Sequence, residues 1–184
     1  MISILIGELK IFIDENTEAE ANMKQFVREL AYQQFNRLGA IERAEDSEDD
    51  KQLRPIILAH MLYSEDKVAI SEALEIYQLA QDISEINAEV RSLVISNKVR
   101  NQESTELIDE LIEIYTKTPN VDLKDDILAA LSSTKNPETG KKMLALMKNP
   151  QIVRPQDLLR WYIYLLRNLK TRDLTWQWLR NNWQ

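Results

Sequence analysis

Glycine scarcity restricts the possible folds of this chain more than any other feature of its sequence. The 184 residues include 3 glycines, whereas average usage of ~7% would give roughly 13. Hairpin turns in sheet proteins depend on residues that adopt a positive φ, and glycine adopts it most easily. The sequence therefore disfavours β-sandwich and β-barrel folds.

Apolar residues recur at spacings of three and four along nearly the whole chain, which is the period of an amphipathic helix. Short breaks separate these segments, and two successive helices with their turns take about 35–45 residues, as in HEAT and armadillo repeats. We therefore predict an all-α fold with a single helical domain over residues 1–184. About ten antiparallel helices in stacked hairpins would form a HEAT- or armadillo-like superhelical array.

Several residues mark the expected ends of these helices. Gly39 stands where a left-handed C-terminal cap is expected. Ser47 can cap the helix that follows, and Ser64 the next one. Pro55 falls inside the helix after Ser47, where a proline costs about 3 kcal/mol, so the sequence predicts a kink at Pro55 or a later helix start.

Both ends of the sequence fall inside the helical pattern. Met1 precedes an apolar helical face directly, and Trp183 and Gln184 continue the last pattern with no glycine, proline or capping residue after them. Natural domains usually end in exposed polar residues. We therefore expect the chain to be an excised part of a longer polypeptide.

The net charge of −7 is unevenly distributed. Residues 1–150 hold 28 acids and 17 bases, a balance of −11, whereas residues 151–184 hold 2 acids and 6 bases, a balance of +4. An acidic surface repels phosphate backbones, so we expect no nucleic-acid partner. No apolar run approaches the ~18 residues that cross a bilayer. Because a signal peptide and cysteine are also absent, we expect no membrane partner and a cytoplasmic location.

The supply of reactive side chains excludes most enzyme classes. His60 is the only histidine and there is no cysteine, so an HExxH zinc motif cannot form within this chain. The glycines at positions 7, 39 and 140 lie too far apart for a phosphate-binding loop. We predict no catalytic residue, no metal ligand and no cofactor in this chain. His60 is expected to be a partly buried, hydrogen-bonded helix residue.

Acidic residues are numerous, but they lie where solvated helix faces are expected. Glu106, Asp109, Glu110 and Glu113 stand at helical spacing. The acidic run Glu45–Asp50 lacks the Asp/Asn ladder and the central glycine of an EF-hand loop. Its acids after Ser47 suit the first turn of a helix, which we favour over a loose cation site.

All four tryptophans lie in the C-terminal stretch, at positions 161, 176, 178 and 183, among several bases. Interleaved aromatic and basic residues can form a stacking platform for single-stranded nucleic acid. Trp176, Leu179 and Trp183 share one helical face, however, which is typical of a packing seam. We favour the seam, and in an excised fragment we expect the missing helices to leave an exposed apolar patch here.

Two blocks of the sequence form recognisable motifs. The first contains Arg37-Leu38-Gly39, the acidic run, and then Asp50-Lys51-Gln52-Leu53-Arg54-Pro55. The second contains Val153-Arg154-Pro155-Gln156-Asp157 and, from Arg172 to Trp183, the more specific pattern R-D-x-x-W-x-W-L-x-x-N-W. In this order and at this separation, the blocks resemble the C-terminal helical domain of the zinc aminopeptidase N family, over roughly residues 5–183.

The resemblance implies a function that this chain does not carry alone. In that family a thermolysin-like domain holds zinc through HExxH and a downstream glutamate, and a GxMEN motif binds the free amino end of the substrate. The matching part is a bundle of HEAT-like hairpins that caps the catalytic domain and shapes the substrate chamber. The resemblance thus implies a non-catalytic C-terminal domain of an aminopeptidase that removes N-terminal residues from peptides, with zinc in the missing catalytic domain. The expected partners are that catalytic domain, in the same polypeptide, and the peptide substrate.

Arg54 is the candidate substrate-binding residue. It follows the acidic run on a helix, where it could pair with Glu48 or Asp50, and an arginine fork also suits a peptide carboxylate. The alternative function is a stand-alone helical-repeat scaffold that binds a protein partner on its concave face. A helical domain that binds nucleic acid through its basic, Trp-rich end is a third hypothesis.

Overall fold

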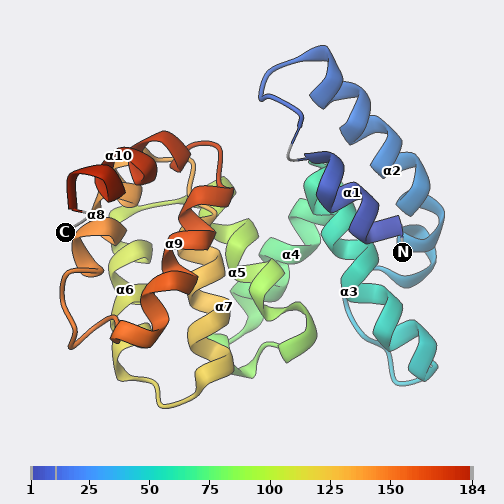
Figure 1. Cartoon of the computed structure of the whole chain (residues 1–184). Helices are drawn as coiled ribbons and strands as arrows, with labels where there is room; N and C mark the ends of the chain where they lie inside the picture. Colours follow the sequence, from blue (N-terminus) through green and yellow to red (C-terminus); the bar gives the residue numbers. More distant parts are fainter. Residues whose placement is uncertain (1, 11, 183–184) are drawn as a thin grey trace. The chain divides into compact units, whose positions relative to one another are not determined.

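The computed structural model describes residues 2–10 and 12–182, and most of them are helical (Figure 1). The α-helices are α1 (Ile2–Lys10), α2 (Glu18–Leu38), α3 (Glu48–Tyr63), α4 (Lys67–Leu79), α5 (Ala88–Gln102), α6 (Thr105–Lys117), α7 (Val121–Ser132), α8 (Pro137–Leu146), α9 (Leu158–Arg167) and α10 (Arg172–Asn182). Two 3₁₀ turns, η1 (Ile83–Glu85) and η2 (Pro155–Asp157), precede α5 and α9. Because these residues include no β-strand, the predicted all-α fold is confirmed. No helix among them has the length and apolar character that a membrane span requires.

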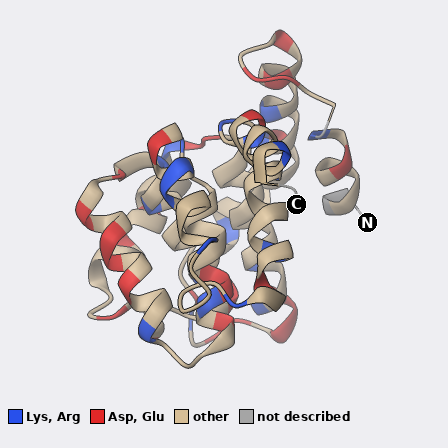
Figure 2. Ribbon diagram, turned by 60° about the vertical axis from the view of Figure 1, so that its left-hand side comes forward, with Lys and Arg blue, Asp and Glu red and all other residues tan. Residues whose placement is uncertain are grey.

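The chain divides into two compact units, Met1–Leu93 and Val94–Gln184, with the boundary inside α5. Consecutive helices pack together within each unit, as expected for hairpins. In the first unit α2 packs on α3, and in the second α6 packs on α7 and α9 on α10. Acidic residues, drawn red in Figure 2, lie on turns and helices of both units. The single-domain organisation and the superhelical course of the array stay predictions.

The first unit is built around the α2–α3 pair. α2 buries one residue in almost every turn, at spacings of four and then three: Met23, Val27, Ala31, Phe35 and Leu38. Burial of these residues against the rest of the unit stabilises α2, because an isolated helix in water is only marginally stable. α1 contributes Ile6 to a cluster with Met23 and Val27.

Among the described residues of the second unit, a core of large aliphatic side chains contains one buried tryptophan. Trp161 of α9 is fully buried, and its indole N–H donates to the Tyr115 hydroxyl of α6 at 3.0 Å. The two rings meet edge to face with centroids 5.3 Å apart, a favoured aromatic geometry. Asn168, which follows α9, donates its amide to the carbonyls of Ser132 and Thr134 at 2.8 Å. These bonds satisfy backbone groups at the end of α7, which would otherwise be orphaned.

Two of the expected helix ends are found where the sequence places them. Gly39 ends α2 with φ of 63°, and its N–H donates to the Phe35 carbonyl at 2.7 Å. Its ψ of −171° puts it outside the left-handed helical region, in a region that glycine alone occupies easily. Ser47 caps α3 as predicted, because its hydroxyl accepts from the Asp50 N–H at 3.2 Å.

One other expectation about helix ends is wrong, and one of the two alternatives at Pro55 is excluded. Ser64 does not begin a helix but ends α3, with its N–H bonded to the His60 carbonyl. α4 is capped instead by Asp66, a residue type as favourable as serine at an N-cap, and its carboxylate accepts from two backbone N–H groups. Pro55 does not delay the start of its helix, because α3 begins at Glu48 and continues through Pro55 to Tyr63.

The C-terminal tryptophans differ widely in environment. Trp161 is buried, Trp178 of α10 lies 6.4 Å from the Tyr162 ring, and Trp176 is 53% exposed. Trp183 of the predicted packing seam lies outside the described residues. Leu159 and Ile163 of α9 are exposed as well. This exposure agrees with the apolar patch expected in an excised fragment.

The close approach of α8 to the start of α10 generates the first prediction. A Cβ added at Gly140 would lie 2.7 Å from the Thr171 Cγ2, and Thr171 is fully buried with its hydroxyl bonded to the Leu165 carbonyl. We expect Gly140→Ala to lower the free energy of unfolding by about 1–2 kcal/mol in a urea titration, because overpacking outweighs the better helix propensity of alanine.

Gly7→Ala is the matched control for this substitution. Gly7 also lies in a helix, but no atom of residues 2–10 and 12–182 is found within 4 Å of its added Cβ. Only the propensity term applies there, so the free energy of unfolding should rise by up to about 1 kcal/mol. A rise of similar size in both variants would contradict the tight packing inferred at Gly140.

Candidate binding site around Arg54

The connection between α2 and α3 positions the candidate site. After the turn at Gly39, the N–H of Ala40 donates to the Glu72 carboxylate of α4 at 2.9 Å. The Arg43 N–H donates to the Asp46 carboxylate at 2.5 Å. Local hydrogen bonds to acidic side chains thus hold this connection, which the sequence marks only as an acidic run.

Arg54 projects from α3 into the protein rather than toward solvent. It is 2% exposed, and its Nη2 donates to the Asp46 carboxylate at 2.5 Å. Both Nε and Nη2 also lie 3.4 Å from the Leu38 carbonyl at the end of α2. Among the described residues, Nη1 has no hydrogen-bond partner although it is buried.

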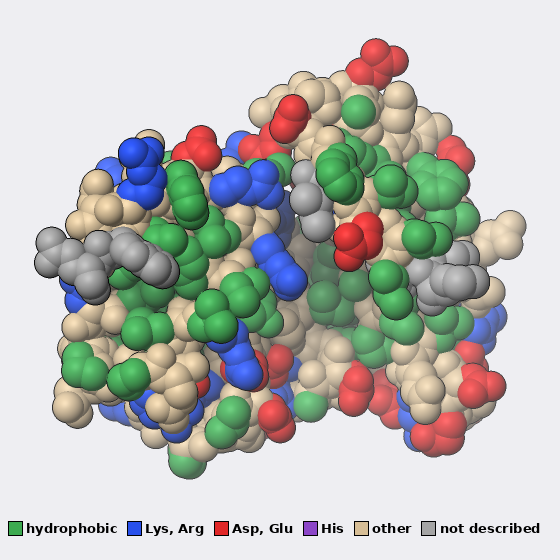
Figure 3. Space-filling view, viewed as in Figure 1, with side chains coloured by type: hydrophobic (Ala, Val, Ile, Leu, Met, Phe, Trp, Pro, Cys, Tyr) green, Lys and Arg blue, Asp and Glu red, His purple; other side chains and the backbone are tan. Residues whose placement is uncertain are grey.

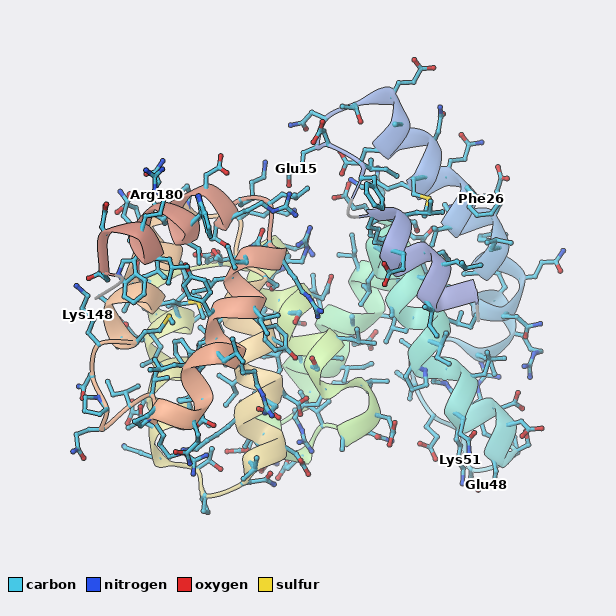
Figure 4. The ribbon with its side chains drawn as sticks, viewed as in Figure 1. Glu15, Phe26, Glu48, Lys51, Lys148 and Arg180 are labelled. Carbon is cyan, nitrogen blue, oxygen red and sulfur yellow. The ribbon has the colours of Figure 1, made fainter. Side chains whose placement is uncertain are left out.

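The predicted partners of Arg54 are wrong. Asp50 pairs with Arg37 at 2.7 Å. Glu48 pairs with Lys51 at 2.9 Å, and these two residues are labelled side by side in Figure 4. Glu48 and Asp50 belong to the first turn of α3, which points its acids outward, whereas Arg54 points inward. Asp46 precedes the Ser47 cap and is the acid that reaches the interior.

These contacts change the ionisation of the acids around Arg54. The Arg43 backbone N–H, and then the Arg54 guanidinium, lower the pKa of Asp46 below its ordinary value. The Arg37 guanidinium lowers the pKa of Asp50 in the same direction. Both carboxylates are therefore ionised at neutral pH, and Arg54 lies in a region whose charge is already balanced by Asp46.

A pocket of about 530 Å³ opens beside Arg54. The connection after α2, the N-terminal half of α3, α4 and the start of α5 line it, through Ala40, Ile41, Glu42, Glu48, Lys51, Gln52, Arg54, Pro55, Ile76, Asn87, Glu89 and Val90. Its volume falls in the range of about 300–1,000 Å³ that is usual for ligand sites. Its wall combines aliphatic side chains with charged and amide groups, which suits a ligand of mixed polarity.

Several polar groups in the pocket wall are incompletely paired. The Glu42 carboxylate accepts from the Asn87 amide at 2.9 Å and lies 3.9 Å from the Lys51 ammonium. No described residue pairs with the carboxylate of Glu89. Pro55 has no N–H, so the Lys51 carbonyl lacks its intrahelical donor. These groups are available to a ligand.

The remaining candidate residues form no site in the part of the chain that is described. His60 is half-buried, and burial, followed by the charge of Lys10, lowers its pKa. Glu106, Asp109, Glu110 and Glu113 are exposed, as a solvated helix face should be. Residues 2–10 and 12–182 contain no group of three or more His, Cys, Asp or Glu side chains that could hold a metal ion.

The sequence analysis missed an exposed apolar face on α1 and α2. Hydrophobic side chains gather over these helices in Figure 3, and Phe26 projects from α2 in Figure 4. Phe12, in the turn after α1, is 83% exposed, and Phe26 is 50% exposed. Ile4, Leu5, Leu9 and Leu30 are exposed with them. Exposed apolar side chains that gather on one face are typical of an interface.

Comparisons with known proteins match the whole chain to a single kind of domain. A family model described as the ERAP1-like C-terminal domain matches residues 2–184. Aminopeptidase N of Lactobacillus delbrueckii subsp. lactis is 35% identical over 177 residues, which are 96% of this chain and 21% of that protein. Aminopeptidase N of Lactococcus lactis subsp. cremoris, strain MG1363, is 34% identical over 183 residues, 99% of this chain and 22% of that protein.

In a more distant relative, this chain again covers about a fifth of the protein. Aminopeptidase 2 of Candida albicans is 29% identical over an alignment of 189 positions that covers 97% of this chain and 20% of that protein. The chain therefore spans about a fifth of the length of the curated relatives that it matches.

The buried Arg54–Asp46 pair generates the second prediction. Arg54→Met removes the partner of a carboxylate whose side chain is 8% exposed, so we expect the free energy of unfolding to fall by about 3 kcal/mol in urea. Arg37→Met is the matched control, because the Arg37 side chain is half exposed in its pair with Asp50 and exposed pairs contribute little. Equal losses in the two variants would contradict a special role for the buried pair.

The lowered pKa of Asp46 generates the third prediction. In the unfolded chain this carboxyl titrates near 3.8, and in the folded chain it titrates lower. Its contribution is therefore fully present above pH 3.8 and is lost as the pH falls through the folded value. We expect urea midpoints to fall on acidification below about pH 4, and Asp46→Asn to have a lower midpoint at neutral pH and a shallower acid dependence. An unchanged slope in this variant would contradict the inference.

Proposed function

The chain belongs to the family of ERAP1-like C-terminal domains, and on this premise we propose that it is a non-catalytic domain of a zinc-dependent aminopeptidase. The parent enzyme would remove N-terminal residues from peptides, and this domain would cap its catalytic domain and shape the substrate chamber. The observation that carries the proposal is the alignment of nearly the whole chain with about a fifth of several aminopeptidases N.

The residues of this chain do not fit the zinc ion of such an enzyme. The sequence has one histidine and no cysteine, whereas protein zinc sites are built from several His, Cys, Asp or Glu ligands. We assign the zinc and the bond-breaking chemistry to the part of the parent enzyme outside this chain, and no catalytic step to its residues.

The proposed partner of this domain is the catalytic domain of the same polypeptide. The exposed apolar face of α1 and α2, with Phe12 and Phe26, supports such a contact, because burying it would contribute about 25 cal/mol for each Å² of apolar surface removed from water. In the second unit, the exposed Trp176 and Leu159 offer a further surface for covering helices.

Arg54 is the residue that we propose to bind the peptide substrate. Its place in the wall of a 530 Å³ pocket supports this role. We also propose a cytoplasmic location, since the chain contains no cysteine and the cytoplasm is the compartment in which disulfides are rarest.

The fourth prediction tests the proposed function against the stand-alone scaffold. Antibodies raised against this chain should detect, in a lysate of its source, a protein about five times longer than 184 residues, because the relatives have that ratio of lengths. The captured protein should hydrolyse aminoacyl-nitroanilides, and a zinc chelator should abolish that activity. The isolated chain is the control and should be inactive. A band near 21.5 kDa without activity would establish the independent scaffold instead.

A further inference from the structure

We propose that the pocket beside Arg54 binds a peptide through a lysine or arginine side chain, so that this domain selects peptides that carry a basic residue. The pocket would hold the cationic head near Glu42 and Glu89 and the peptide backbone near Arg54 and Lys51. One part of this inference rests on the proposed function, namely that the bound peptide is a substrate of the parent enzyme.

The charges in the pocket wall favour a cation. Glu42, Glu48 and Glu89 supply three carboxylates. Both wall cations are engaged, since Arg54 is paired with Asp46 at 2.5 Å and Lys51 with Glu48 at 2.9 Å. Glu89 has no cationic partner in the described part of the chain, whereas Glu42 accepts from the neutral Asn87 amide and lies 3.9 Å from the Lys51 ammonium. An ammonium or guanidinium entering the pocket would therefore find Glu89 without a competing cation, and for Glu42 it would compete only with a long, partly exposed pair.

The pocket's unpaired hydrogen-bonding groups match a peptide backbone. A peptide bond offers one carbonyl acceptor and one N–H donor. Arg54 holds a buried Nη1 without an acceptor, and Pro55 deprives the Lys51 carbonyl of its helical donor. A peptide N–H can satisfy the Lys51 carbonyl. The Arg54 Nη1 is covered by protein atoms, so a peptide carbonyl would reach it only after a local movement of the pocket wall.

The aliphatic part of the wall suits the stem of a basic side chain. Ile41, Ile76 and Val90 line the pocket together with the Pro55 ring. Lysine and arginine bury their methylene stems along apolar surface while the charged head stays with polar groups. A glutamate or aspartate side chain would instead bring a fourth carboxylate into the pocket.

The same charges disfavour capture of a free carboxylate by Arg54. Six of the nine residues from Glu42 to Asp50 are acidic, and the guanidinium charge is already balanced by Asp46. A ligand carboxylate would meet net repulsion, whereas a neutral carbonyl would not. The sequence alone suggests that Arg54 binds a peptide carboxylate. The surrounding acids instead favour a neutral peptide carbonyl as its partner.

The fifth prediction is tested by titrating the isotope-labelled chain with three blocked tripeptides followed by NMR. The peptides are acetyl-Ala-X-Ala-amide, with lysine, norleucine or glutamate at X. Norleucine keeps the stem and lacks the charge. We expect the lysine peptide to bind about fivefold more tightly than the norleucine peptide, since a half-exposed ion pair contributes up to about that factor. The glutamate peptide should bind most weakly.

Chemical-shift changes should map to residues 40–42, 51–55 and 87–90. The double variant Glu42→Gln with Glu89→Gln should bind the lysine peptide no better than the norleucine peptide. Glu110→Gln is the matched control, because Glu110 is exposed on α6 of the other unit, and it should bind as the unmodified chain does. Equal affinity for the lysine and norleucine peptides, or an equal effect of the control, would overturn the proposal.

A second experiment tests whether the peptide that occupies the pocket is the substrate of the parent enzyme. In the full-length protein that contains this chain, the double variant should raise KM for a peptide substrate with an internal lysine by about fivefold and leave kcat unchanged. KM for the norleucine substrate should not change. Binding by the isolated chain with no KM effect would overturn the assignment to substrate. A full-length protein without peptidase activity would overturn the proposed function, and the titration would still decide whether the pocket binds a basic peptide.

Discussion

The buried guanidinium of Arg54 holds together the two longest helices of the first unit and the connection between them. It joins three segments that are separate in the sequence: the end of α2 through the Leu38 carbonyl, the acidic connection through Asp46, and α3 itself. A buried ion pair of this kind stabilises little in net terms, because desolvation offsets its attraction. The pair instead selects one conformation of the connection between α2 and α3. Other conformations would leave Arg54 or Asp46 buried without its partner, which costs free energy.

The acidic run is held in place in the same way, by carboxylates that accept hydrogen bonds from neighbouring groups. Asp46 accepts from the Arg43 N–H as well as from Arg54, and Glu72 of α4 accepts from the Ala40 N–H. Six acids in nine residues would otherwise repel one another and remain mobile. Asp46 of the acidic run is bound to internal partners, whereas Glu42 of the same run lies at the rim of the pocket together with Glu89 of α5. The acidic run therefore contributes to both the structural pair and the charge of the pocket.

The sequence predicted the fold well because its signals are local. Helical spacing of apolar residues, the Ser47 cap and the Gly39 turn act within a few residues of one another, and the structure confirms each of them. Ser64 was misassigned because serine and aspartate are similarly favourable N-cap residues, and Asp66, two residues later, takes that role.

The candidate site was less predictable, because its geometry is set by which side of α3 faces inward. Spacing along a helix makes Asp50 as plausible a partner for Arg54 as any acid, and it carries no signal that Asp46 lies inside. Nor does it reveal that Glu89, 35 positions from Arg54, lines the same pocket.

Within the acidic run, burial distinguishes Asp46, which stabilises the fold, from Glu42, which we propose to contact a ligand. Asp46 is covered and paired, so its removal acts on stability, whereas Glu42 lies at the surface and its removal acts on binding. Stability and affinity can therefore be varied separately in this segment, although a single stretch of sequence encodes both.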